Sequence, residues 1–318
     1  MFELSNKDLI KHISQIEGID LVSDLDISNK TTLGLKCIAK NFIQVRTVDG
    51  LTNLISLLIQ KKQNYLVIGK GSNLILPEKI SNPVIQLSFN LPVDELSEEK
   101  HIYNLPASTP LNLMTGKAIK YGLKGWEVFT GVPATLGGAI WMNAGTSLGE
   151  IGELIKSLKI LRRNGVIEKY TISEKDFSYR KNHFLNNGDI IISAEVTHRG
   201  VDKEVSKEII SYLRKRSKTQ PLAKKTCGCT FKNVAIMDDG TTKPCIAGKV
   251  IDILGMKGLH HKDLMVSDVH GNFIENHGVS TQEDFLNFVE TINSRIEKEY
   301  GHQLEMEAIV YRDSISHQ

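Results

Sequence analysis

The 318-residue sequence has few cysteines, no long apolar run and no strong charge imbalance. Its cysteines lie apart at positions 37, 227, 229 and 245, which argues against a disulfide framework and fits a reducing cytoplasm. No segment reaches the roughly 18 apolar residues of a membrane span, and the start carries acids where a signal peptide needs a basic region. The net charge of +2 does not point to nucleic acid. We expect a cytoplasmic protein that binds neither nucleic acid nor membrane and needs no obligate protein partner.

The length exceeds what one typical hydrophobic core supports, so two or three domains are expected. Helical spacing of apolar residues predicts a helical extension over 1–28. A strand, a helix capped by Asp49 and a second strand predict a βαβ unit within 29–90. Residues 91–200 are rich in predicted strands, including a hairpin around Asn164-Gly165. Residues 201–318 begin with a predicted helix and end with a predicted strand. The break at Arg199-Gly200 precedes this segment.

The segment Gly131–Gly145, here called the glycine-rich segment, carries four glycines, a proline and an asparagine around a short apolar run. Glycine at this density indicates a backbone with positive φ or a close approach to another group. Two interpretations are open: a backbone surface for a phosphate-bearing or flat aromatic cofactor, and a turn between core elements.

The segment Gly69-Lys70-Gly71-Ser72-Asn73 follows a predicted strand directly. It is neither a Walker loop nor a dinucleotide-binding fingerprint, because its lysine lies between the glycines and Leu74 occupies the third glycine position. Successive N–H groups around glycines can nevertheless bind an anion. A phosphate loop and an ordinary turn between strands both fit.

Three further patterns contain side chains that are candidates for binding or catalysis. Arg180 follows Tyr179 in a polar segment and offers a planar cation to a carboxylate or enolate, or lies on the surface. Cys227 and Cys229 lack the spacing typical of zinc ligands, so we expect no metal; a buried apolar role and a proton-donating thiol remain. Glu305 and Glu307 share one face of a predicted strand, which faces solvent or lines a cleft.

The order of these motifs resembles that of the UDP-N-acetylenolpyruvoylglucosamine reductases (MurB), also called UDP-N-acetylmuramate dehydrogenases. The resemblance runs from about Thr31 to Tyr311, and its most specific parts are the glycine-rich segment and the Val-Ser-x-x-His-x-Asn-Phe run at 266–273. The short distance from Arg180 to Cys229 is similar to that of the family's shorter type, which lacks a substrate-covering insertion.

The resemblance implies an α+β architecture: a vanillyl-alcohol-oxidase-like (PCMH-type) FAD-binding fold of two subdomains, at 29–90 and 91–200, plus an α/β substrate-binding domain at 201–318. It also implies an enzyme that reduces UDP-N-acetylglucosamine enolpyruvate to UDP-N-acetylmuramate in peptidoglycan synthesis. FAD is the implied cofactor and NADPH the implied co-substrate. No obligate partner protein follows from the resemblance.

The resemblance also assigns residues. It implies Arg180 at the developing enolate, Cys229 as the proton donor where the family commonly has serine, and Glu307 rather than Glu305 as the acidic residue of the last strand. A thiol has a pKa of about 8.5 and loses its proton far more readily than an alkyl hydroxyl. The implied substrate-binding residues are Tyr179, Gln220, Lys232 and Asn233. The implied FAD-binding residues are Gly69, Lys70, Gly71, Ser72, Asn73, Gly131, Pro133, Thr135, Gly137, Gly138, Asn143 and Gly145.

Four positions depart from the family pattern: Ala134, Lys36-Cys37-Ile38, Val234 and Lys262-Asp263-Leu264-Met265. None removes an implied catalytic side chain, but each bears on affinity for FAD or substrate. Two alternative functions remain. One is an FAD-dependent oxidase of the same superfamily, and the other is a flavin- or nucleotide-sugar-binding protein without turnover.

Overall fold

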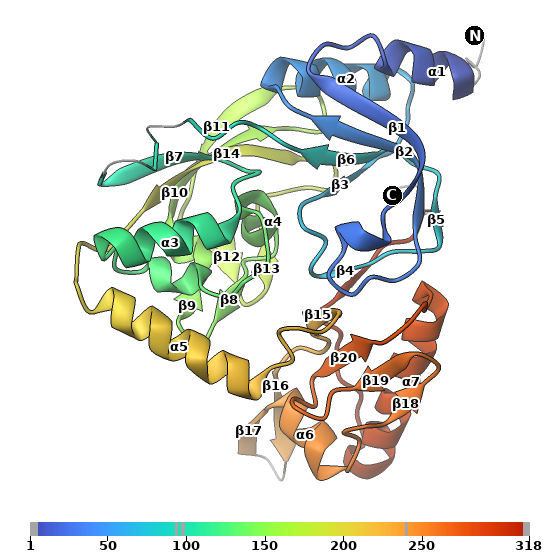
Figure 1. Cartoon of the computed structure of the whole chain (residues 1–318), viewed down its shortest axis with the longest axis vertical. Coiled ribbons are helices and arrows are strands. Elements are labelled where there is room, and N and C mark those ends of the chain that lie inside the picture. Colours follow the sequence, from blue (N-terminus) through green and yellow to red (C-terminus); the bar gives the residue numbers. More distant parts are fainter. Residues whose placement is uncertain (1–5, 93–94, 97–98, 239–240, 314–318) are drawn as a thin grey trace. The chain divides into compact units, whose positions relative to one another are not determined.

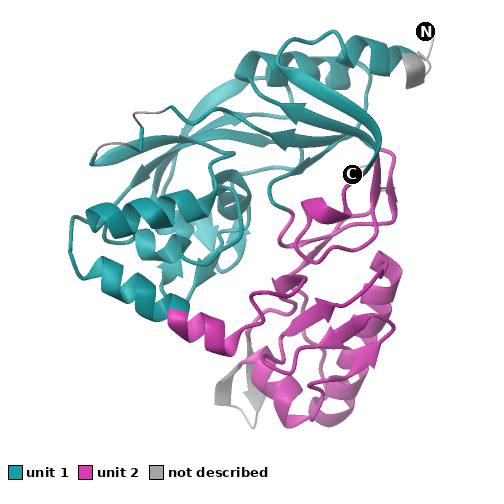
Figure 2. Ribbon diagram, in the orientation of Figure 1, with its two compact units in different colours: residues 1–25, 40–70, 82–213 teal, residues 26–39, 71–81, 214–318 magenta. Residues whose placement is uncertain are grey.

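The computed structural model describes residues 6–92, 95–96, 99–238 and 241–313 (Figure 1). Contacts within the chain divide it into two compact units (Figure 2). The first comprises residues 1–25, 40–70 and 82–213, and the second comprises residues 26–39, 71–81 and 214–318. Each unit is therefore assembled from segments that are distant in the sequence. The division into domains ending at residues 28, 90 and 200 stays a prediction.

One sheet, most of which belongs to the first unit, has the strand order β1 (Ile19–Asp26), β2 (Ile38–Val45), β6 (Val84–Leu87) and β3 (Leu66–Ile68), and β5 (Lys79–Ile80) pairs with β2. Both β2 and β3 run parallel to β6. Helix α2 (Val48–Gln60) connects β2 to β3 and buries Leu51, Leu54 and Leu58 in the same core as Ile43 and Ile85. The predicted βαβ unit is confirmed, although Thr47 rather than Asp49 caps α2 by accepting a hydrogen bond from the N–H of Gly50.

The N-terminal region differs from the predicted helical extension over 1–28. Helix α1 covers only Asn6–Ile13, and Ile19–Asp26 forms strand β1 at the edge of the sheet. Within β1, Ile19 and Leu21 are half-buried while Asp20 and Val22 are exposed, which is the two-residue alternation of a strand. The helical spacing of Leu9 and Ile13 does not extend through this alternation.

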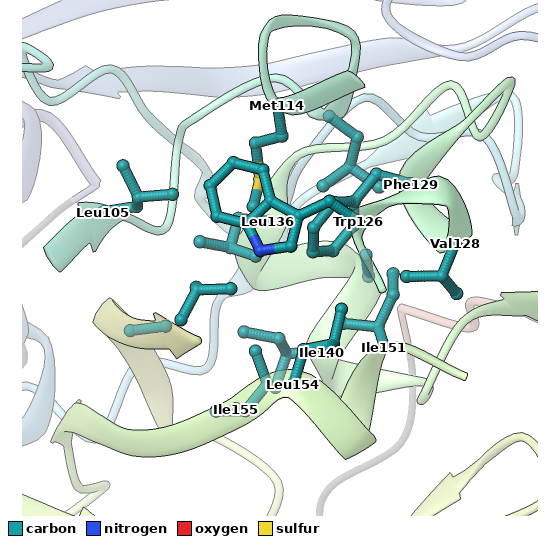
Figure 3. Close-up of a cluster of buried hydrophobic side chains, with 14 of the residues drawn as sticks. Leu105, Met114, Trp126, Val128, Phe129, Leu136, Ile140, Ile151, Leu154 and Ile155 are labelled. Carbon is teal, nitrogen blue, oxygen red and sulfur yellow. The ribbon is translucent and has the colours of Figure 1, made fainter. Parts of the chain in front are cut away.

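The first unit also holds an antiparallel sheet in the order β11 (Ile167–Thr171), β10 (Ile155–Leu161), β14 (Ile190–Thr197) and β7 (Ile102–Pro106). The predicted hairpin corresponds to β10 and β11. Helices α3 (Leu111–Tyr121) and α4 (Leu136–Trp141) contribute to a core around Trp126, where Ile140 of α4 lies close to Ile151 and Leu154 (Figure 3). This core holds α4, and with it the glycine-rich segment, in place.

The short elements of the first unit are two hairpins and three 3-10 turns. The hairpins are β8 (Gly145–Thr146) with β9 (Gly149–Glu150) and β12 (Phe177–Ser178) with β13 (Lys181–Asn182), and the turns are η2 (Trp126–Phe129), η3 (Ile151–Leu154) and η4 (Glu174–Asp176).

The second unit is built on an antiparallel sheet in the order β15 (Thr226–Cys229), β20 (Phe273–Asn276), β19 (Leu264–Val266) and β18 (His260–His261). Helices α6 (Ala247–Ile253) and α7 (Gln282–Tyr300) bury apolar side chains in its core. Strand β21 (Ile309–Val310) runs parallel to β4 (Leu74–Ile75), and η1 (Ser28–Lys30) precedes core residues Leu33 and Leu35. The remaining elements are α5 (Val205–Thr219), whose residues fall in both units, and the hairpin of β16 (Val234–Asp238) with β17 (Thr241–Cys245).

The start of α7 gives Lys262, one of the departures from the family pattern, a structural role. Thr281 and Asp284 form a capping box, in which each side chain bonds the other residue's backbone N–H. The Lys262 ammonium contacts the Asp284 carboxylate, which is 5% exposed. Together with the hydrogen bonds from Thr281, this contact lowers the pKa of Asp284 to about 2.

We expect Asp284→Asn to destabilise the protein by about 2 kcal/mol at neutral pH. Because the folded-state pKa lies below the ordinary value of 3.8, the contribution is fully present above that value and is lost as the pH falls through about 2. Urea unfolding of both proteins should therefore show a difference that shrinks between about pH 4 and pH 2. The exposed neighbour Glu283 gives the control, Glu283→Gln. An equal difference at every pH would contradict the assignment.

Parallel and antiparallel sheets with helices between them confirm the α+β class. Within the described ranges, no helix has the length and apolar character required to cross a bilayer.

Candidate active site

The two glycine segments meet in the first unit at Gly69 and Thr135. A Cβ at Gly69 would lie 2.5 Å from Thr135 Oγ1, a separation that real side chains do not reach. The carbonyl of Gly69 also accepts a hydrogen bond from Gln86 Nε2 at 2.9 Å. Glycine at 69 is therefore required for the close approach of the loop after β3 to the segment before α4.

We expect Gly69→Ala to weaken binding of a ligand held by these two loops by at least about ten-fold, because the added methyl group must displace Thr135. The free protein should be titrated with FAD and followed by flavin fluorescence. Removing the opposing hydroxyl in Gly69→Ala/Thr135→Ala should recover part of the affinity. Gly116→Ala provides the control, since its Cβ would meet nothing within 4 Å. Equal FAD affinity in Gly69→Ala and Gly116→Ala would refute the role of this contact.

Helix α4 begins within the glycine-rich segment, and local contacts fix that start. Thr135 caps the helix by accepting from the N–H of Gly138 at 3.4 Å, and the N–H of Gly137 donates to the carbonyl of Ala107 at 2.8 Å. A Cβ at Gly137 would lie 2.8 Å from that of Ala107. The absence of a side chain at Gly137 therefore allows the start of α4 to pack against Ala107. Ala134 is not among the residues with positive φ, so its methyl group causes no backbone strain.

The surface of these loops fits a cofactor with a phosphate-bearing chain. Gly131, Pro133, Gly138 and Lys70 are exposed. A Cβ at Gly138 would meet only Thr135 Oγ1, at 3.4 Å, so its backbone can be approached closely from outside. The ammonium of Lys70 supplies a positive charge next to the contact at Gly69. These residues could hold the diphosphate of FAD.

Two asparagines predicted to bind the cofactor form side-chain hydrogen bonds with other residues of the chain. Asn143 is 1% exposed and bonds Glu150, Ser178 and Gly152. Asn73, in the second unit, donates from Nδ2 to the carbonyl of Glu307 at 2.9 Å, and its own carbonyl accepts from the N–H of Ile309. Of the other predicted FAD-binding residues, Gly71 is buried with a φ of 58°, Ser72 accepts from Thr32 through its carbonyl, and Gly145 lies in β8.

In the second unit the chain near Cys229 pairs with the chain that carries Glu307. Phe231 and Met306 form an antiparallel bridge, and the N–H of Glu307 donates to the carbonyl of Thr230 at 2.8 Å. Cys229 and Glu307 therefore belong to neighbouring segments. Both are half-buried, whereas Glu305 is exposed and pairs with Lys232. This difference between the two glutamates agrees with the expectation that Glu307 is the functional one, and that expectation stays a prediction.

Asn272 fixes the backbone of this pairing through its side chain and its carbonyl. Its side chain accepts from the N–H of Phe231 at 2.9 Å and donates to the carbonyl of Phe231 at 2.8 Å. Its carbonyl accepts from the N–H of Thr230. Asn272 thus fixes the backbone immediately after Cys229. The sequence feature that could have indicated this role is the position of Asn272 in the Val-Ser-x-x-His-x-Asn-Phe run.

The two neighbouring cysteines differ in their surroundings. Cys227 is 5% exposed, and burial raises the pKa of its thiol to about 12. Its side chain packs in the core of the second unit. Cys229 is half-buried and lies one residue before the buried Thr230. Among the described residues, no group of histidine, cysteine and acidic side chains is arranged to hold a metal ion.

Arg180 lies in the first unit, in the two-residue turn between β12 and β13. Its φ of 55° is in the left-handed region, which is uncommon for a residue other than glycine. Nη2 donates to the carbonyl of Gly145 at 2.9 Å, and the guanidinium lies 4.8 Å from the centre of the Tyr179 ring. The side chain is 15% exposed. A cation held by several groups at a strained backbone position is typical of a functional site.

The predicted substrate-binding residues lie in different surroundings. Tyr179 is exposed over Arg180. Gln220 accepts from Arg216 at 2.8 Å just after α5, Lys232 pairs with Glu305, and the exposed Asn233 accepts from the N–H of Ala247 at the start of α6. Lys232 and Asn233 are neighbours on the segment that follows Cys229.

Comparisons with known proteins agree with both units. Residues 39–171 match an FAD binding domain, and residues 220–311 match the C-terminal domain of UDP-N-acetylenolpyruvoylglucosamine reductase. The reductase of Clostridioides difficile (strain 630) is 32% identical over 268 residues, covering 83% of this chain and 84% of the relative. That of Prochlorococcus marinus (strain NATL2A) is 30% identical and covers 92% of this chain and 98% of its own length. The crystal structure of the enzyme from Thermus caldophilus superposes with a TM-score of 0.73 at 32% identity, covering 92% of this chain and 99% of that one.

An FAD-binding fold of this type with a separate C-terminal domain defines an FAD-dependent oxidoreductase, which confirms the expected fold and cofactor. The chain belongs to the UDP-N-acetylenolpyruvoylglucosamine reductase family.

Proposed function

We propose that this protein reduces UDP-N-acetylglucosamine enolpyruvate to UDP-N-acetylmuramate with NADPH, in the cytoplasm. The pairing of the segment after Cys229 with the one that carries Glu307 is the observation that supports this function best. Bound FAD supplies the hydride chemistry, since it can accept a hydride from NADPH and pass it to the vinyl group of the substrate. Cys37, Cys227 and Cys229 are free thiols, which suits a reducing compartment.

The residues of this chain supply binding, charge and a proton. When hydride adds to the terminal vinyl carbon, negative charge develops towards the carboxylate, and we assign its stabilisation to the Arg180 guanidinium. Cys229 then donates its proton to the neighbouring carbon, so that one hydride and one proton saturate the double bond, and the thiolate regains a proton from water. We assign Glu307 to the same proton transfer. Lys232 and Asn233 are assigned to the nucleotide diphosphate.

The test separates the two halves of the reaction under anaerobic conditions. NADPH should bleach the flavin absorbance of the purified yellow protein, and the enolpyruvyl nucleotide should then restore it with formation of one equivalent of product. Bleaching without recovery would refute the proposed substrate. Oxygen consumption with alcohols or sugars in place of this reaction would support an oxidase. A flavin that NADPH cannot bleach would indicate a binding protein without turnover.

A further inference from the structure

One buried asparagine in the first unit connects three segments around Arg180. Asn143 has a φ of 46° and is 1% exposed. Its Nδ2 donates to Glu150 Oε2 at 2.6 Å and to the carbonyl of Ser178 at 3.0 Å, while its Oδ1 accepts from the N–H of Gly152 at 3.0 Å. It therefore ties the end of the glycine-rich segment to β9 and to the hairpin whose turn contains Arg180.

Glu150 is held by this asparagine on one side and faces Arg180 on the other. One carboxylate oxygen accepts from Asn143, and the other lies 3.9 Å from Arg180 Nη1. The Gly145 carbonyl, which accepts from Arg180 Nη2, belongs to the residue that pairs with Glu150 between β8 and β9. A Cβ at Gly145 would lie 3.0 Å from Arg180 Nη1, so this glycine leaves space for the guanidinium. The cation thus lies against a small hairpin that presents a carbonyl and a carboxylate.

These contacts do more than pair two charges. Arginine loses considerable side-chain entropy when it is fixed, and its flat guanidinium acts well on an anion only in one orientation. The side chain of Glu150 is 30% exposed, and without Asn143 it would be free to turn towards water. Charge stabilisation in a reaction requires a cation that is oriented before charge develops, because reorientation during the step costs energy.

We propose that Asn143 and Glu150 are positioning residues for Arg180, which fix the guanidinium for the enolate of the second half-reaction. This inference rests on the proposed function. Asn143 then serves the reaction without touching the cofactor, although it lies within the glycine-rich segment. Hydride transfer from NADPH to FAD does not involve this network.

The decisive variant is Glu150→Gln, which keeps the shape and the hydrogen bond from Asn143 but removes the charge that faces Arg180. We expect reoxidation of the reduced flavin by the enolpyruvyl nucleotide to slow about ten-fold, and reduction by NADPH to change less than two-fold. FAD content and thermal midpoint should match those of the unaltered protein. The matched control is Glu153→Gln, three residues along, whose carboxylate pairs with Arg199 instead. This control should leave both half-reactions unchanged.

A double-mutant cycle distinguishes positioning from general support of the fold. If Glu150 acts through Arg180, Glu150→Gln should change the second half-reaction less than about two-fold when Arg180→Ala is already present. Additive effects, equal slowing of both half-reactions, or a normal second half-reaction in Glu150→Gln would each overturn the inference. Failure of the unaltered protein to be reoxidised by this substrate would instead overturn the proposed function, and the inference with it.

Discussion

Cys229→Ala should lower kcat about 1,000-fold and change KM less than about three-fold, because the variant lacks a proton donor for the substrate carbon. Cys229→Ser should keep kcat within about ten-fold of the unaltered protein, since a hydroxyl can donate from the same position. Both values come from steady-state NADPH oxidation with the enolpyruvyl nucleotide. Bleaching of the flavin by NADPH alone should proceed normally in both variants, because the proton is needed only after hydride has left the cofactor.

Cys227→Ala supplies the control for this experiment. It removes a thiol two residues away that is buried in the core and whose pKa is raised to about 12 by burial. We expect a lower thermal midpoint for this variant and nearly unchanged kcat at a permissive temperature. Normal turnover in Cys229→Ala, or an equal loss of turnover in both variants, would show that Cys229 is not the donor.

Arg180→Ala should slow reoxidation of the flavin by substrate about 100- to 1,000-fold, the range typical of removing a group that stabilises developing negative charge. Arg180→Lys should recover little of this loss. A single ammonium cannot both donate to the Gly145 carbonyl and present a planar pair of donors to the substrate. Stopped-flow measurement of each half-reaction gives the result directly, since reduction by NADPH should stay within two-fold of normal.

Arg199→Ala is the matched control, because Arg199 is exposed and pairs with Glu153 rather than Glu150. Its half-reactions should be unchanged. If Arg180→Ala slowed reduction by NADPH as much as reoxidation by substrate, the arginine would serve cofactor binding or the fold instead of the enolate.

Local patterns predicted much of the fold. The turn residues Asn164-Gly165 predicted the β10–β11 hairpin, and the strand–helix–strand pattern within 29–90 predicted α2. Strand β1 was missed because the helical spacing over Leu9 and Ile13 was extended past the end of α1 at Ile13, although Gly18, with a φ of 79°, directly precedes β1. The assembly of the second unit from residues 26–39, 71–81 and 214–318 has no local signal, since it depends on contacts between segments far apart.

The assignments of the candidate site residues stay predictions, and the contacts of these residues in the structure had no signal in the sequence. The motif order indicated Arg180, Cys229 and Glu307, but it did not indicate that Asn73 would bond the backbone of Glu307. It also placed Asn143 among cofactor contacts, and the structure gives its three hydrogen bonds to the protein. Side chains that bond distant backbone groups leave no periodic or spacing signal, because their partners are set by the tertiary fold.

The pairing of β4 with β21 has a consequence for how the protein is made. The core of the second unit includes Leu33, Leu35 and Ile75, and Ile309 pairs with Leu74 across more than two hundred residues of chain. During synthesis, the core of the second unit cannot form completely until β21 has been translated, because β4 pairs with it. Contacts of such sequence separation slow folding. A fragment containing only residues 214–318 should remain unfolded, because it lacks the segments 26–39 and 71–81 of the same unit. For the same reason, residues 214–318 should not fold when they are fused to a different protein.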